Sequence, residues 1–154
     1  MKPITGPQTY QDGTMSFSVP ANWKVTVQGK GGGCGYAFVE APGEGIVFIK
    51  GLPLKKDPGI EKYAHEFSRT ANSWTPIGKI TSKGFRSFID NPVGAGVKES
   101  FTITFLGVDV PHTRVYRKQT GSHCVFYILT QVADEDAAAV EPGFRQILNS
   151  FSAK

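Results

Sequence analysis

Two segments at opposite ends of the chain indicate its fold: YQDGTMSFSVPANW, residues 10–23, and FRQILNSF, residues 144–151. In the first segment Asp12 and Gly13 form a turn signal, and every second residue after it is apolar up to a proline that precedes Trp23. The second segment spaces its apolar residues as an amphipathic helix does. We therefore expect the chain to begin with a β-hairpin and to end on a short helix packed against a sheet.

The length of 154 residues predicts one domain with a single substantial core. We expect that domain to span residues 9–154 and to follow a flexible N-terminal segment, residues 1–8. The 18 glycines and 10 prolines are spread over many connections, which is typical of an antiparallel sheet with short turns.

The middle of the chain predicts one helix and then four long strands. Apolar residues recur at spacings of three and four between residues 60 and 74, which predicts a helix ending before Pro76. Short, turn-like links separate the strand candidates that follow, so neighbouring strands should be antiparallel. The four candidates are residues 80–89, 97–106, 112–118 and 123–132, and the almost wholly apolar residues 125–129 predict the central strand.

The two predicted helices have different start signals. Asp57 is an N-cap candidate, and Pro58 follows it at the position expected to open the first helix. The acidic residues 134–136 open the last helical region. Because proline removes a backbone donor, Pro142 is expected to divide that region into one turn at residues 137–140 and a helix that restarts at the proline.

The two end segments and the order of elements resemble the PsbP-like superfamily. Its members begin with a glycine, an alternating strand, a proline, a small residue and a tryptophan, and they end on a helix that closes with Ser-Phe. The resemblance covers nearly the whole chain. It implies an α+β fold, an αβα sandwich with a central antiparallel sheet, one helix after the N-terminal strands and one at the C-terminus.

The resemblance also implies a noncatalytic binding or assembly module. The superfamily includes the extrinsic photosystem subunit, the Ran-binding import factor and DcrB-like envelope lipoproteins. We expect a bacterial cell-envelope protein with a protein partner, periplasmic or secreted, whose leader is absent from this chain. The alternative is a cytoplasmic chaperone or adaptor for a secreted effector, which requires an exposed apolar groove and reduced cysteines. A third hypothesis is a small hydrolase, which requires a polar pocket with converging histidine and carboxylate groups.

Charge and hydropathy restrict the partners. The formal charge of +4 arises from 17 basic and 13 acidic residues that are spread along the chain. Nucleic-acid binders cluster their cations beside stacking aromatics, so we expect no nucleic-acid partner. No stretch approaches the ~20 apolar residues of a membrane span. Membrane attachment is expected only through a lipid anchor absent from this chain.

The only two cysteines, Cys34 and Cys124, have two readings. In an exported protein they would form one disulfide between a glycine-rich loop and a core strand. Alternatively, Cys124 is a buried apolar thiol beside Val125 and Phe126. Spacing alone does not choose between these readings.

No motif predicts a catalytic residue, a cofactor or a metal site. The glycine-rich residues 29–35 lack the Lys-Ser/Thr pair and the following helix of a phosphate-binding loop. His65-Glu66 lacks the second histidine of a zinc-protease helix, because Arg69 occupies its place. No serine lies in a Gly-x-Ser-x-Gly context.

Two surfaces are predicted to contact a partner. One is the glycine-rich loop, which can deform at low cost and whose centre is Gly31, Gly32 and Gly33. The other is one side of a predicted strand, where Arg114, Tyr116 and Lys118 alternate with other residues. Lys98 and Arg86 could approach this side if their strands are neighbours. The alternative for the strand is a solvated sheet edge whose charges discourage aggregation.

Overall fold

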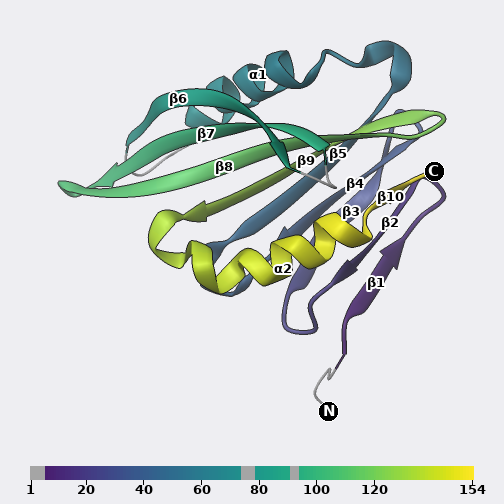
Figure 1. Ribbon diagram of the computed structural model, residues 1–154, viewed down its shortest axis with the longest axis horizontal. Coiled ribbons are helices and arrows are strands. Elements are labelled where there is room, and N and C mark those ends of the chain that lie inside the picture. The colour runs from purple at the N-terminus through teal and green to yellow at the C-terminus, as the bar shows by residue number, and fades with distance from the viewer. Residues whose placement is uncertain (1–5, 74–78, 91–93) are drawn as a thin grey trace.

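The computed structural model describes residues 6–73, 79–90 and 94–154 (Figure 1). Helix α1 (Ile60–Ser73) covers one face of a large sheet, and helix α2 (Ala137–Ser150) covers the other. The strands are β1 (Gln8–Gln11), β2 (Met15–Val19), β3 (Lys24–Gly31), β4 (Cys34–Glu40), β5 (Ile46–Pro53), β6 (Lys79–Asp90), β7 (Gly94–Phe105), β8 (Val108–Thr120), β9 (Cys124–Ala133) and β10 (Ser152–Ala153). Short 3₁₀ turns lie at Pro42–Glu44, Leu54–Lys56 and Asp134–Asp136.

The seven-stranded sheet has the order β3-β4-β5-β9-β8-β7-β6, and every neighbouring pair is antiparallel. The predicted central strand is confirmed, because β9 is the middle strand of the seven. A register shift between Ser82 and Gly84 interrupts the pairing of β6 with β7, at a glycine in the strand interior. The molecule is thus the predicted α+β sandwich, with a helix on each face of an antiparallel sheet.

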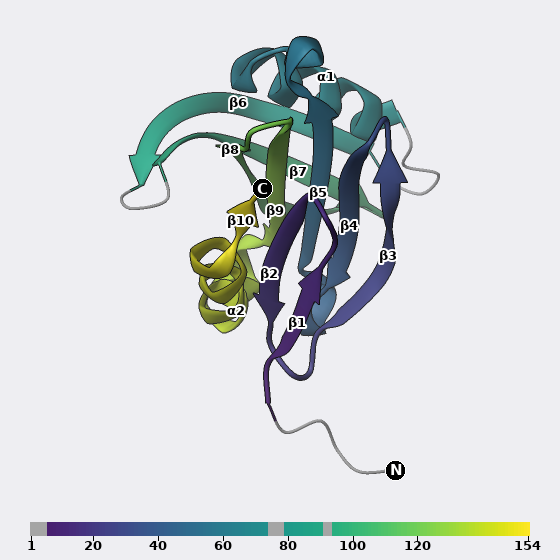
Figure 2. The ribbon, with the colours of Figure 1, turned by 90° about the vertical axis from the view of Figure 1, so that its right-hand side faces the viewer.

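The hairpin predicted from residues 10–23 forms a second, three-stranded sheet with the order β1-β2-β10. Residues Met15, Phe17 and Val19 of β2 are buried, and the intervening serines are half-exposed, as the alternation predicts. The last residues of the chain return to pair with β2, so both ends of the chain meet in this sheet. Figure 2 shows it in front of the large sheet, beside α2.

Two apolar clusters fill the space between the layers. The larger one lies between the large sheet, β2 and α2, and it includes Phe17, Ile49, Phe126 and Ile147. The smaller one lies under α1. No helix within the described ranges combines the length and the apolar character that crossing a membrane requires.

The aromatic residues of the two end segments are buried, as predicted. Trp23 is 6% exposed and packs edge-on against Phe144, with ring centroids 5.6 Å apart. Phe151 is 9% exposed and contacts Phe17 and Phe126. The Trp23 ring lies directly on Gly143, where a Cβ would overlap it. A glycine in α2 therefore allows the N-terminal tryptophan to reach the helix backbone.

The C-terminal helix differs from the prediction, because α2 continues through Pro142 without a break. Proline there removes one backbone donor and crowds the carbonyl of the preceding turn, but buried side chains hold the helix on both sides of it: Val140 before it and Phe144 after it. Packing against the sheet therefore outweighs the local penalty.

The start of α1 also differs, because the helix begins at Ile60 and not at Pro58. Asp57 instead turns its carboxylate to the backbone N–H of Gly59, 2.9 Å away, and to groups on the sheet. Trp74, predicted to end the helix, lies outside the described residues. Gln8, predicted to be flexible, is paired with Val19 in β1.

The structure contains the disulfide between Cys34 and Cys124, which are 90 positions apart in sequence and whose Cα atoms are 6.0 Å apart. It joins the start of β4 to the start of β9, two strands that β5 separates in the sheet. Of the two readings of these cysteines, the bonded one is correct.

The contact between Trp23 and Gly143 is testable by two substitutions. Trp23→Ala should lower the free energy of unfolding by about 3–5 kcal/mol, because a buried ring leaves a cavity. Gly143→Ala should also destabilise the protein, although in an unobstructed helix the same change stabilises by about 0.5–1 kcal/mol. Urea unfolding followed by circular dichroism measures both. In the Trp23→Ala background the obstruction is gone, so Gly143→Ala should become neutral or stabilising; an equal loss in both backgrounds would contradict the contact.

Reduction should also destabilise the fold. Opening the Cys34–Cys124 bond releases a long loop in the unfolded chain, and we expect a loss of about 2–4 kcal/mol. Urea unfolding with and without dithiothreitol measures it. The Cys34→Ser/Cys124→Ser variant is the control, because its stability should not respond to the reductant.

Candidate anion-binding groove

The register of β8 turns the predicted basic strand face toward α1, so that Arg114, Tyr116 and Lys118 all lie on the covered side of the sheet. Tyr116 pairs with Val97 and Leu129 and packs with them beneath α1. Arg114 and Tyr116 are each only 1% exposed. The predicted partner surface of Arg114, Tyr116 and Lys118 is therefore wrong for its first two members, and so is the alternative of a solvated edge.

A buried ionic network replaces that surface. The Glu99 carboxylate is fully buried and accepts hydrogen bonds from Arg114 Nη1 at 2.9 Å, Tyr116 Oη at 2.8 Å and Ser68 Oγ at 2.5 Å. Arg114 Nε donates to Gln131 Oε1 at 2.8 Å, and its guanidinium lies 4.3 Å from the centroid of a phenylalanine ring in β7. Because each charge has a partner, the network joins α1, β7, β8 and β9 without an orphaned ion.

Burial raises the pKa of the Tyr116 hydroxyl well above its ordinary value. A neutral phenol can then donate to the Glu99 carboxylate at all physiological pH values. This network has the residue types of an acid–base site, but its members are closed to solutes in this structure. Its chemistry is that of a polar core.

Lys118 lies outside the buried network, close to the N-terminal end of α1, where it contacts Asp57. Its Nζ lies 2.5 Å from Asp57 Oδ2, and the Tyr127 hydroxyl donates to the other carboxylate oxygen. Burial alone would raise the pKa of Asp57, but the hydrogen bonds from Lys118, Tyr127 and Gly59 outweigh it and hold that pKa below its usual value. Lys118 therefore holds the segment that precedes α1 against the sheet, and it does not belong to an exposed basic patch.

The glycine-rich loop is shorter than predicted. Gly31 belongs to β3, and only Gly32 and Gly33, with φ of 62° and 83°, make the turn. The next residue, Cys34, is bonded to Cys124, so the disulfide holds this turn against the start of β9. It lies on the β3–β4 side of the sheet, whereas Arg114 lies on β8, and the structure does not bring the two predicted surfaces together.

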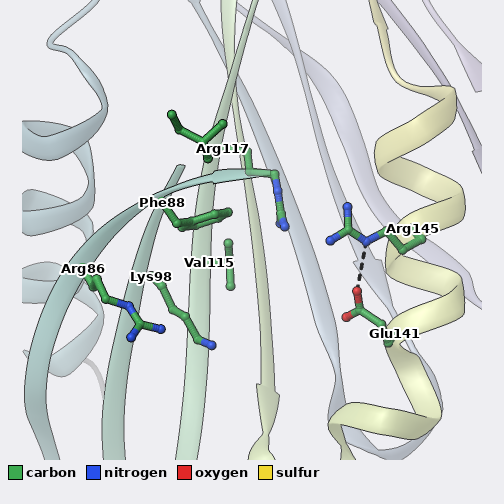
Figure 3. Close-up of a pocket in the computed structure, with 8 residues that line it drawn as sticks. Arg86, Phe88, Lys98, Val115, Arg117, Glu141 and Arg145 are labelled. Atoms are coloured by element: carbon green, nitrogen blue, oxygen red, sulfur yellow. Dashed lines mark hydrogen bonds and ion pairs between the residues drawn. The ribbon is translucent and has the colours of Figure 1, made fainter. Parts of the chain in front are cut away.

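The opposite face of β6, β7 and β8 holds a groove with a cavity of about 400 Å³, drawn in Figure 3. Helix α2 forms its other wall. Four of the described lining side chains are basic, one is acidic and three are apolar. They are Arg86, Lys98, Arg117, Arg145, Glu141, Phe88, Ile89 and Val115.

Arg86 and Lys98 are directly opposite one another in the β6–β7 ladder. Like charges in this position repel one another and destabilise a sheet. The two side chains run into the same groove (Figure 3). An anion bound between them would remove the repulsion, so the pair favours a negatively charged ligand.

Arg117 supplies a third cation from β8, on the side opposite Arg114. It is 6% exposed, and its guanidinium lies over the Phe88 ring, 5.4 Å from the centroid. The ring lies flat because its ladder partner is Gly96, where a Cβ would stand 2.6 Å from Cζ of Phe88. A glycine and an aromatic residue thus build the platform that positions the guanidinium.

Arg145 closes the groove from α2. Its Nε donates to Glu141 Oε1 at 3.0 Å, one helical turn away, and Figure 3 shows its guanidinium facing that of Arg117. Both residues of this ion pair are partly exposed. The positive charge therefore converges from two layers of the sandwich, and the half-enclosed setting weakens the screening of that charge by salt.

A second hollow of about 390 Å³ continues the groove along the sheet and shares Arg86 and Lys98 with the first. Its far end contains Asp134, whose carboxylate accepts a hydrogen bond from Thr113 Oγ1 at 2.7 Å. The positive stretch therefore ends at Asp134. An elongated hollow with a charged centre suits an extended ligand better than a single small ion.

The groove can bind and orient anions, and the described lining of its first hollow includes no hydroxyl, thiol or histidine side chain. Arginines offer paired N–H donors to carboxylate or phosphate oxygens. Across the described part of the chain, no group of three or more His, Cys, Asp or Glu side chains could hold a metal ion.

The architecture of this chain is similar to that of solved structures. A cyanobacterial PsbP, CyanoP from Synechocystis sp. PCC 6803, superposes with a TM-score of 0.60 at 15% identity, over 97% of this chain and 93% of the other. The chain has a PsbP-like fold. LpqN, described as involved in cell envelope biogenesis of Mycobacterium tuberculosis, superposes with a TM-score of 0.50 at 11% identity, over 95% of this chain and 88% of the other. No family model and no curated protein sequence matches the chain.

Within this PsbP-like fold, the sequence reading missed Arg117 and Arg145. The alternation along β8 correctly separated two faces, but we took the more polar face as the exposed one. The apolar stripe of α1 covers that face, and Glu99 on β7 neutralises the Arg114 charge beneath it. The register of β6 with β7, which places Arg86 opposite Lys98, was the missing signal, and alternation along a single strand does not specify that register.

The buried network makes a prediction about stability. Glu99→Ala should cost about 3–5 kcal/mol, because it leaves the Arg114 charge buried and unpaired. The double variant Glu99→Leu/Arg114→Met should lose less than the sum of the two single changes, since no charge remains inside. Denaturant unfolding measures each variant. Glu66→Ala is the control, because its ion pair with Lys62 on α1 is 4.0 Å long and exposed, and its loss should cost less than about 0.5 kcal/mol.

Proposed function

We propose that this protein is a noncatalytic binding module of the cell envelope whose groove receives an acidic segment of a protein partner. The observation that carries the proposal is the convergence of Arg86, Lys98, Arg117 and Arg145 on one groove with a single carboxylate, Glu141, in its described lining. The described lining therefore holds more basic than acidic side chains in a half-enclosed space. Such a site gains most from a ligand that supplies several negative charges.

An extended acidic segment fits better than a single small anion for two reasons. The charged groups are spread over two adjoining hollows that share Arg86 and Lys98. The Phe88 ring and the Val115 side chain add apolar contact area between the charges. A peptide with acidic and apolar side chains would use both kinds of contact.

Two observations support an envelope location. The Cys34–Cys124 disulfide is a bond that oxidising compartments maintain and that the cytoplasm usually keeps reduced. The structural neighbour LpqN is described as involved in cell envelope biogenesis. The cytoplasmic chaperone alternative required reduced cysteines and an apolar groove, and both requirements fit the structure less well.

A binding measurement tests the groove. A fluorescein-labelled peptide that alternates glutamate with leucine serves as the probe, and fluorescence anisotropy follows its binding across a salt series. The Arg86→Glu/Lys98→Glu variant should lose at least about tenfold in affinity, because it reverses two of the converging charges. A peptide with glutamine in place of glutamate should bind weakly to the native protein.

The matched control is Lys55→Glu/Lys56→Glu, which changes the net charge equally on an exposed turn outside the groove. If both double variants bind the acidic peptide alike, the attraction is a property of net charge and the groove is not the site. Turnover of an ester or phosphate substrate by the purified protein would overturn the noncatalytic part of the proposal.

A further inference from the structure

The tip of the β7–β8 hairpin exposes three apolar side chains within four residues. Phe105 is 46% exposed, Leu106 is 86% exposed and Val108 is 61% exposed. Isolated exposed apolar residues are common on protein surfaces, but three at one turn form a concentrated apolar tip. This tip lies on a different part of the sheet from the basic groove and needs its own explanation.

The sequence of this turn is unfavourable for its backbone conformation. Phe105 pairs with Val108, and the two residues between them, Leu106 and Gly107, have φ of 50° and 78°. Two-residue turns of this kind normally use Asn-Gly or Asp-Gly, because asparagine and aspartate tolerate positive φ. Leucine at this position combines backbone strain with exposure of a large apolar side chain. Folding gains nothing from it, so a contact outside the chain is the better explanation.

The tip lies at the periphery of the molecule, and a side-chain hydrogen bond joins the two strands just behind it. The Thr104 hydroxyl donates to Asp109 Oδ1 at 2.6 Å and fastens the two strands just behind the turn. In Figure 1 the hairpin reaches the left-hand end of the longest axis, beyond the helices and the other strands. Its apolar side chains can therefore meet a flat surface before the rest of the protein does.

We propose that this tip inserts Phe105, Leu106 and Val108 into the surface of a lipid bilayer. A specific protein interface buries about 800 Å² on each partner, which a two-residue turn with three apolar side chains does not provide. A bilayer needs no shape complementarity and surrounds a convex tip from all sides. Lys79, exposed and paired in register with Thr104, places a cation where lipid phosphates lie.

Leu106→Asn tests the proposal without endangering the fold, because it creates the Asn-Gly sequence that this turn normally prefers. Vesicles of phosphatidylcholine, with and without phosphatidylglycerol, are sedimented with the native protein and with the variant. The native protein should bind both kinds, and the variant should lose at least about tenfold in partitioning. Its melting temperature should equal or exceed that of the native protein.

Leu54→Asn is the matched control, because Leu54 is 40% exposed on a 3₁₀ turn away from the hairpin, and this variant should keep its vesicle binding. The proposal falls if the native protein does not sediment with vesicles or if Leu106→Asn binds them equally well. It also falls if binding needs phosphatidylglycerol and is lost only in Arg86→Glu/Lys98→Glu, since the groove would then hold the headgroup. Self-association abolished by Leu106→Asn in sedimentation velocity would assign the tip to a second copy and overturn it as well.

Discussion

The burial of β9 on both faces is the constraint on which the rest of the structure depends. Every residue from Cys124 to Thr130 is buried, so each face of the central strand needs a cover. Helix α1 covers one face, and α2 with the three-stranded sheet covers the other. The chain satisfies this constraint with elements from both of its ends, which is why Trp23 and Phe151 belong to the same apolar cluster.

The same constraint decides which charges are structural and which are available to a ligand. Arg114 and Arg117 are three residues apart on β8 and therefore point to opposite faces. Under α1 the Arg114 guanidinium must have a partner, and Glu99 provides it at 2.9 Å. On the other face α2 crosses at a distance that leaves a groove, and there Arg117 faces further cations. One strand thus contributes to the polar core and to the candidate binding site.

The sheet is long enough for its ends to have separate roles. One edge of the sheet, where β3 turns into β4, is tied to the central strand by the disulfide. On the other side of β9, the strands β6, β7 and β8 carry the basic groove and, beyond it, the exposed apolar tip at Leu106. A module whose groove and tip lie on the same three strands could hold a partner segment while it rests on a surface.

Sequence patterns were sufficient to predict the element order, the antiparallel pairing, the central position of β9 and the burial of Trp23 and Phe151. These features follow from local periodicity and turn chemistry, which act over a few residues. The start of α1, the continuity of α2 through Pro142 and the choice between a disulfide and free thiols required the tertiary structure. Each depends on contacts between segments that are distant in sequence.

The candidate site shows most clearly which features local sequence patterns predict and which depend on contacts between distant segments. Alternation along β8 told us that Arg114 and Tyr116 share a face, but it could not tell us that α1 covers that face. The groove exists only because β6, β7, β8 and α2 meet in one register, which places Arg86 opposite Lys98 and Arg145 across from Arg117. A one-residue change in that register would turn these side chains to the other face, so only the tertiary structure could decide which charges converge.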